Sequence, residues 1–126
     1  MKEPISKIDF MNAMNSIAES VYDFHQRWNL FGVSKSPFNA VAEREDLLLE
    51  EVKELIAEYS KNINEASVEL LSREAADVLY VSMGSMLALH QDGAEAMLQV
   101  AKKNNNKTSK THFYNEKENK VKKLDV

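Results

Sequence analysis

The chain of 126 residues has no cysteine, only three glycines and two prolines. The absence of cysteine excludes disulfides, zinc-thiolate sites and thiol catalysis, and it favours a reducing cytoplasm as the location. Glycine and proline are frequent in the turns between strands, so their scarcity disfavours a β-rich fold and favours long helices. No apolar run reaches membrane-spanning length, and no apolar segment follows basic residues at the N-terminus. We therefore expect a cytoplasmic protein with no membrane partner.

The net charge of −4 conceals an uneven distribution of charge along the chain. Residues 43–58 hold seven acids and two bases, whereas eight lysines and three acids follow Val100. An acidic patch combined with a basic tail can hold a metal ion and a polyphosphate together. From composition alone, a solvated acidic helix followed by a disordered tail is the alternative.

Apolar residues recurring at steps of three and four predict four helices, over residues 6–28, 39–60, 65–90 and 93–103, with Asp92 capping the last. The third is apolar nearly all round its middle, which indicates burial on several sides. We expect an all-α, four-helix-bundle-type fold that is completed by homo-oligomerisation. The helical domain would span residues 1–103. The polar tail, residues 104–126, would complete or cover a site, and it is either disordered alone or folded over a partner.

Two acidic clusters, one on the second and one on the third predicted helix, are the main indication of a function. Glu50, Glu51 and Glu54 share one side of the second predicted helix, a pattern that is also common on solvated helices. Glu74 and Asp77 lie one turn apart in an otherwise apolar stretch and should point toward a neighbouring helix. Because unpaired carboxylates in an apolar face are costly, we predict that the two clusters together bind Mg²⁺, with Mn²⁺ able to substitute.

The charge of these acids could also be offset without Mg²⁺. The acids could pair with Lys53 or Arg73, or one carboxyl could be protonated. Di-iron carboxylate bundles also place glutamates on facing helices, but they need Glu-x-x-His pairs. None of His25, His90 and His112 follows a glutamate at that spacing, so a di-iron site is excluded.

The spacing Glu51-x-x-Glu54 and Glu74-x-x-Asp77 resembles the signature of the MazG-like all-α nucleoside triphosphate pyrophosphohydrolases, closest to their phosphoribosyl-ATP pyrophosphohydrolase-like branch. The similarity spans residues 21–123. It includes three further elements: Phe24-His25, Val100-x-x-x-Asn104-x-x-Lys107, and Asn119-Lys120-Val121-x-Lys123, where the branch has glycine in place of asparagine.

The resemblance implies an enzyme, a hydrolase of phosphoric anhydrides. It would cleave a nucleoside triphosphate between the α- and β-phosphates, giving a monophosphate and pyrophosphate, in a nucleotide-pool or house-cleaning role. Phosphoribosyl-ATP hydrolysis is one alternative, and a non-catalytic helical module for nucleotide binding or dimerisation is another. The identity of the nucleotide and the number of metal ions stay open. The partners would be the nucleotide and further copies of the chain, as a homodimer or a dimer-of-dimers tetramer, with no nucleic-acid polymer.

The resemblance also assigns roles to individual residues. The metal would be held by Glu50, Glu51, Glu54, Glu74 and Asp77, and either Glu50 or Glu51 would be the catalytic base. Asn104, Lys107 and Lys110 would contact the phosphates. Contacts to the nucleobase would come from His25, Trp28, Asn29 and Tyr80.

Overall fold

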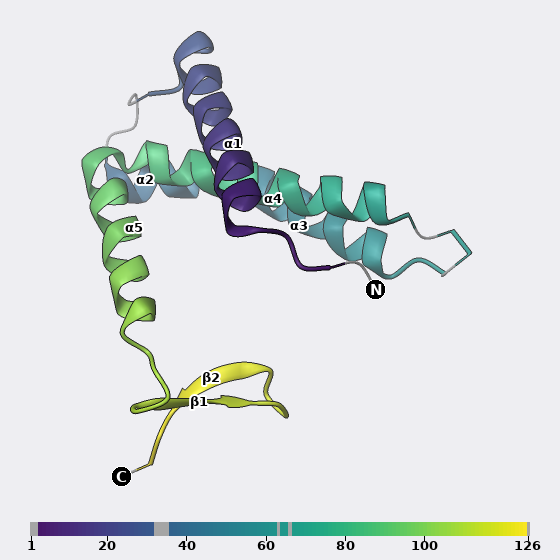
Figure 1. Cartoon of the computed structure of the whole chain (residues 1–126). Coiled ribbons are helices and arrows are strands. Elements are labelled where there is room, and N and C mark those ends of the chain that lie inside the picture. Colours follow the sequence, from purple (N-terminus) through teal and green to yellow (C-terminus); the bar gives the residue numbers. More distant parts are fainter. Residues whose placement is uncertain (1–2, 32–35, 63, 66, 126) are drawn as a thin grey trace.

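The computed structural model describes residues 3–31, 36–62, 64–65 and 67–125. It is mostly helical, which confirms the all-α prediction, with one small sheet added (Figure 1). The elements in chain order are α1 (Lys7–Arg27), α2 (Pro37–Ala42), α3 (Glu45–Tyr59), α4 (Val68–Ala88), α5 (His90–Asn105), β1 (His112–Asn115) and β2 (Lys120–Lys123). None of the helices in the described ranges is long and apolar enough to cross a membrane.

Local signals in the sequence explain most helix ends. The hydroxyl groups of Ser6, Ser36 and Ser67 accept a backbone N–H in the first turn of α1, α2 and α4, at 3.1–3.2 Å. Pro37 occupies the first position of α2, where its missing N–H costs nothing. Just beyond α1, Asn29 adopts the left-handed conformation (φ 54°) that ends many helices. The connection between α1 and α2 includes positions 32–35, which lie outside the described residues.

Helix α4 is the centre of the arrangement. Its main contacts are with α3, which lies beside it, and it is also contacted by α1, α2 and α5. Figure 1 shows α1 crossing the α3–α4 pair, and α5 leaving at a steep angle with the β1–β2 hairpin at its far end. The corner between α4 and α5 is made by His90, whose φ is 53°.

The single helix predicted over residues 39–60 is wrong, because the chain turns at Glu43–Arg44 and forms α2 and α3. No glycine or proline marks this break. Arg44 instead donates hydrogen bonds from Nε to the Ser85 hydroxyl (3.2 Å) and from Nη2 to the Val81 carbonyl (3.0 Å). These hydrogen bonds hold the junction on α4, and the local periodicity of the sequence cannot predict them.

Two helix starts also differ from the prediction. Helix α4 begins at Val68, because Ser67 provides the cap. Helix α5 begins at His90, directly after the corner, with Leu89 in the cap position. Asp92 therefore lies in the first turn of α5 and does not cap it.

The tail is ordered as an antiparallel hairpin in which Phe113 pairs with Lys122, and Tyr114 with Val121. Asn119 (φ 54°) supplies the left-handed residue of the connecting turn. The Asn115 side chain accepts the backbone N–H of Glu118 at 2.9 Å and stabilises the same turn.

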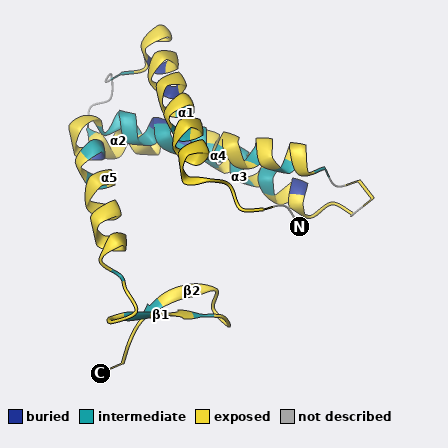
Figure 2. Cartoon of the chain, viewed as in Figure 1, coloured by how far each residue is buried: buried dark blue, intermediate teal, exposed yellow. Residues whose placement is uncertain are grey.

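Within the described residues, Val21 and Val81 are the buried large apolar side chains. Phe10, Phe24 and Trp28, which belong to the predicted apolar stripe of the first helix, are exposed, and exposed residues cover most of the surface (Figure 2). On α4, residues 78–88 are all buried or half-buried, whereas most of residues 68–77 are exposed. The predicted burial of the third helix on several sides is therefore found only in its second half within one copy of the chain.

Candidate metal and nucleotide site

Three predicted metal ligands converge between α3 and α4. Glu51 and Glu54 lie one turn apart on α3, and Glu74 faces them from α4. Each contributes a carboxylate oxygen, and the three oxygens lie within 4.8 Å of one another. The prediction that the two acidic clusters meet is therefore correct for these three residues.

The environment of this triad (Glu51, Glu54 and Glu74) penalises its negative charge. Glu51 and Glu74 are half-buried, and each has one buried oxygen with no hydrogen-bond partner in the described structure. Burial, and next the charges of Glu54 and Asp77, raise the pKa of the Glu51 carboxyl. The pKa of Glu74 is raised by the same causes in the same order. A carboxyl group so placed needs a proton or a cation close by.

Glu50 and Asp77 form the outer part of the cluster. Both are exposed within one copy of the chain. Both residues still act on the triad electrostatically, because the charges of Glu50 and Asp77 contribute to the raised pKa of Glu51.

The triad fits a hard divalent cation. Its donors are all carboxylate oxygens, as Mg²⁺ and Mn²⁺ prefer, and the buried unpaired oxygens of Glu51 and Glu74 are available for coordination. The alternative partner Arg73 pairs instead with Glu69 on its own helix at 2.8 Å, and both of these side chains are exposed. Lys53, the other alternative, has an exposed side chain.

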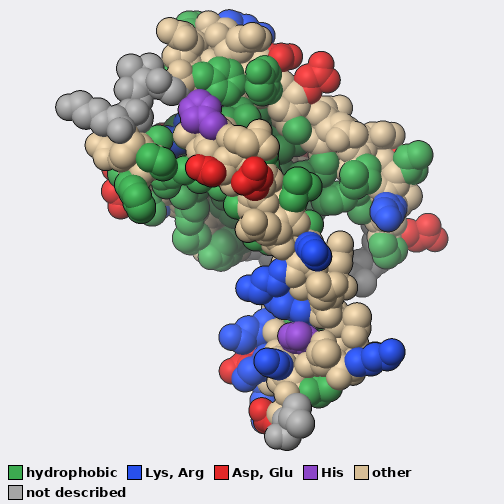
Figure 3. All heavy atoms as spheres, turned by 90° about the vertical axis from the view of Figure 1, so that its left-hand side faces the viewer, with side chains coloured by type: hydrophobic (Ala, Val, Ile, Leu, Met, Phe, Trp, Pro, Cys, Tyr) green, Lys and Arg blue, Asp and Glu red, His purple; other side chains and the backbone are tan. Residues whose placement is uncertain are grey.

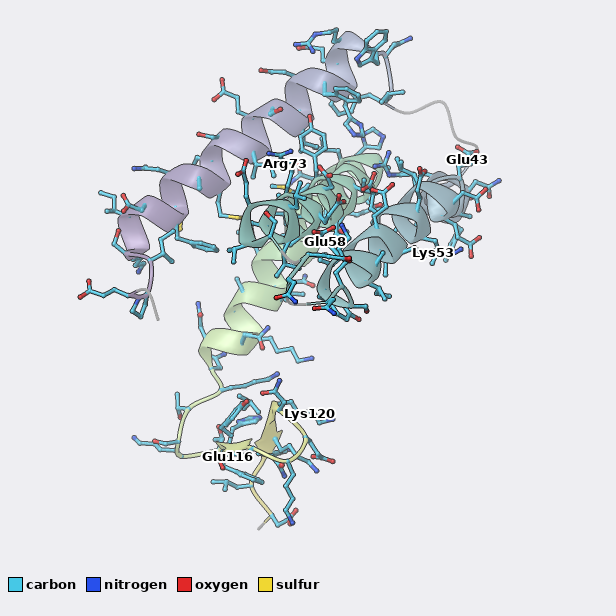
Figure 4. The ribbon with its side chains drawn as sticks, turned by 90° about the vertical axis from the view of Figure 1, so that its right-hand side faces the viewer. Glu43, Lys53, Glu58, Arg73, Glu116 and Lys120 are labelled. Carbon is cyan, nitrogen blue, oxygen red and sulfur yellow. The ribbon has the colours of Figure 1, made fainter. Side chains whose placement is uncertain are left out.

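Sequence reasoning missed Glu58, one turn beyond Glu54 on α3 (Figure 4). Its side chain is only 8% exposed. One carboxylate oxygen pairs with Lys61 Nζ at 2.8 Å, while the other is buried without a hydrogen-bond partner among the described residues. The Glu58 charge also contributes to the raised pKa of Glu74. The sequence signal for Glu58 was its position four residues after Glu54, on the same side of the helix.

Three of the predicted nucleobase contacts gather around Phe24. Its ring centroid lies 6.4 Å from that of His25, 6.3 Å from Trp28 and 6.0 Å from Tyr80. A hollow of about 310 Å³ opens beside Phe24 and Tyr80, lined mainly by α1. Trp28 and Asn29 are exposed. His25 is only 3% exposed, so its ring is part of the interior.

Arg44 is a second residue that sequence reasoning missed. It is half-buried beside His25, and it lines a hollow of about 570 Å³ between α2 and the corner of α4 and α5. Burial and, next, the Arg44 charge lower the pKa of the His25 imidazole, which favours its neutral form. A buried histidine predicts a nearby partner, but nothing in the sequence points to Arg44.

The predicted phosphate contacts lie elsewhere in the same chain. Asn104 donates from its side-chain amide to the Val100 carbonyl within α5 (2.9 Å), and Lys107 and Lys110 follow in the connection to β1. Figure 3 shows lysine and arginine side chains gathered at the hairpin end, with hydrophobic side chains spread over the helical part. The structure therefore does not bring these three residues to the triad within one copy.

Comparison of the chain with protein-family models, with curated proteins and with solved structures finds no match in any of the three. The chemistry of the site and the spacing of its motifs are therefore what indicate a function.

Proposed function

We propose that this protein is a Mg²⁺-dependent nucleoside triphosphate pyrophosphohydrolase that cleaves between the α- and β-phosphates. The observation that carries the proposal is the convergence of Glu51, Glu54 and Glu74, each with a carboxylate oxygen within 4.8 Å of the other two. Glu51 and Glu74 also each have one buried oxygen without a hydrogen-bond partner among the described residues. The resemblance of the two acidic motifs to the MazG-like enzymes supplies the reaction.

Each group of residues has its own part in this reaction. The triad holds the cation, with Glu50 and Asp77 at its outer edge. A divalent cation bound there supplies neutralisation of phosphate charge and a lowered pKa for the attacking water. Glu50 or Glu51 would accept the proton of an attacking water as the water oxygen bonds to phosphorus. One P–O bond of the α–β bridge breaks in the same step, and the leaving phosphate group takes its electron pair.

A homo-oligomer in the cytoplasm is part of this proposal. Exposed apolar residues on every long helix support further copies of the chain as the missing neighbours of α4. A homodimer or a dimer-of-dimers tetramer would complete a helix bundle that the single chain leaves open.

The test is release of pyrophosphate from a panel of nucleotides, including phosphoribosyl-ATP, with Mg²⁺ or Mn²⁺. We expect product with at least one substrate, and a loss of about 100-fold or more for Glu54→Gln and Asp77→Asn, because each removes one carboxylate charge from the cation site. Glu95→Gln makes the same chemical change at an exposed position on α5 and should keep full activity.

Metal binding is measured separately from turnover. Mg²⁺ at about 100 times its dissociation constant should stabilise the wild type by about 2.7 kcal/mol and raise its Tm, and this shift should shrink in Glu54→Gln. If Mg²⁺ leaves the Tm unchanged and no nucleotide is cleaved, the protein is the non-catalytic helical module. Full activity in both Glu54→Gln and Asp77→Asn would show that the metal site lies elsewhere.

A further inference from the structure

Within the described part of the chain, the C-terminal arm, residues 106–125, has no main contact with any helix. Strands β1 and β2 have their main contacts with each other. Phe113 is 44% exposed and Tyr114 is 56% exposed, and cross-strand pairing places them on opposite faces of the hairpin. A two-stranded hairpin is at best marginally stable alone in water. The arm therefore needs another surface to cover it.

The arm is directed away from the acidic triad of its own chain. After the corner at His90, α5 continues for 16 residues, or about 24 Å, before the arm begins. In Figure 4, Glu116 and Lys120 of the arm lie well apart from Glu58 and Lys53 of α3. A contact between this arm and its own triad would require α5 to fold back.

Charge complementarity points to the acidic side of α3 and α4 as the docking surface. The arm carries six lysines and three acids. The opposite sign prevails around the triad, where Glu50, Glu58 and Asp77 add to its charge, and Lys61 is the cation that pairs there with Glu58. The two surfaces have opposite net charge and lie on different parts of one chain.

The arm and the acidic side of α3 and α4 also both carry exposed apolar side chains. On one face of the arm, Phe113 lies across from Lys122, with Lys120 two positions along the same strand. On α4, Leu70 is exposed and lies one turn before Glu74, on the same side of the helix. An aromatic ring flanked by lysines can thus pack on an apolar side chain that lies beside a carboxylate of the triad.

We propose that the arm docks on a second copy of this chain and places its lysines beside that copy's triad. The proposal rests on the proposed function for its consequence: the arm's lysines would neutralise the triphosphate that the triad's cation also binds. A complete site would then consist of acids from one copy and lysines from the other.

Mixed oligomers test this division of the site. Glu54→Gln disables the triad and keeps the arm, whereas Lys107→Ala/Lys110→Ala/Lys120→Ala disables the arm and keeps the triad. Each protein alone should be nearly inactive. Co-refolded in equal amounts, random dimers should regain about a quarter of wild-type activity, because half of them contain one complete site out of two. Activity that stays at background in verified mixed dimers would overturn the proposal.

A cross-linking experiment decides the contact without any turnover. The full chain carries a benzophenone amino acid in place of Phe113, and equal amounts of ¹⁴N- and ¹⁵N-labelled protein are co-refolded before illumination. We expect cross-links from position 113 to residues 50–77 that join the two isotopes. Cross-links confined to one isotope, or joining only arm to arm, would overturn the docking. If the expected cross-links form but no nucleotide is cleaved, the docking stands and the proposed function fails.

Discussion

Arg44 connects three parts of the fold through one side chain. Its hydrogen bonds to Ser85 and Val81 fix it on α4, and its charge lies beside the imidazole of His25 from α1. Gly84 provides the space, because a Cβ atom at this position would collide with the Arg44 guanidinium and lie 2.8 Å from His25 Nε2. The glycine near the C-terminal end of α4 is thus explained by close packing of polar groups from α1 and the α2–α3 junction.

Gly84→Ala should therefore destabilise the protein, although alanine normally favours a helix over glycine by about 1 kcal/mol. We expect a loss of about 1–3 kcal/mol, measured by chemical denaturation, because Arg44 and His25 must move. In an Arg44→Ala background the added cost of Gly84→Ala should be smaller. Equal costs in both backgrounds would show that Arg44 is not the obstacle.

The triad predicts an unusual pH dependence of stability for the metal-free protein. Glu51 and Glu74 have a pKa raised above the ordinary value, so the folded state binds their protons more strongly than the unfolded chain does. Their contribution to stability is then greatest at acid pH and is lost as the pH rises through the folded-state pKa values.

Glu74→Gln should accordingly raise the Tm in EDTA, by more at pH 7 than near pH 4.5. The neutral amide removes repulsion that is present only when the carboxylates are ionised. Differential scanning calorimetry at the two pH values measures the effect, with the exposed Glu95→Gln as control. A Tm for Glu74→Gln below that of the wild type at pH 7 would contradict the assigned electrostatics.

At the scale of elements, the sequence predicted what local patterns determine. The periodicity of α1, α3 and α4 and the placement of Glu51 and Glu54 on one side of α3 follow from 3.6 residues per turn. The break at Arg44 could not be predicted, because it depends on hydrogen bonds to residues about 40 positions away. The hairpin escaped prediction since β1 and β2 have four residues each, and the Lys120–Lys123 segment resembles a solvated tail.

The turn of the hairpin offers a direct test of that element. Asn119 has φ 54°, a conformation that glycine adopts without strain and that a β-branched residue resists by about 1–2 kcal/mol. Asn119→Gly should keep the cross-strand contact between Tyr114 and Val121 in nuclear Overhauser spectra, whereas Asn119→Val should lose it. The melting of the helices should be much less affected by either change, and a preserved contact in Asn119→Val would refute the turn assignment.

At the scale of the whole molecule, the balance of buried and exposed apolar surface is that of an incomplete unit. Val21 and Val81 alone do not make a core for the described residues, whereas large apolar side chains are exposed on all the long helices. Sequence patterns could indicate that these stripes are buried, but they could not tell whether the covering surface belongs to the same chain. That information depends on symmetry between copies.

We therefore expect an oligomer whose Tm increases with protein concentration. Phe10→Asp, on the exposed apolar stripe of α1, should shift the sedimentation profile toward smaller species. Asn12→Asp adds the same charge at an exposed polar position of the same helix and should leave the profile unchanged. A wild type that sediments as a monomer at micromolar concentration would contradict this expectation.

The corner at His90 sets the direction in which α5 leaves α4. The ring centroid of His90 lies 6.4 Å from that of Phe31. A Cβ atom at Gly93 would collide with the Met86 carbonyl oxygen, so the backbone at this corner is closely packed. A change of about 10° in the direction of α5 would move its far end by about 4 Å. The backbone conformation of His90 thus determines the position of the lysines of the arm. If the arm docks as proposed, substitutions at this corner should change where its lysines contact the second copy.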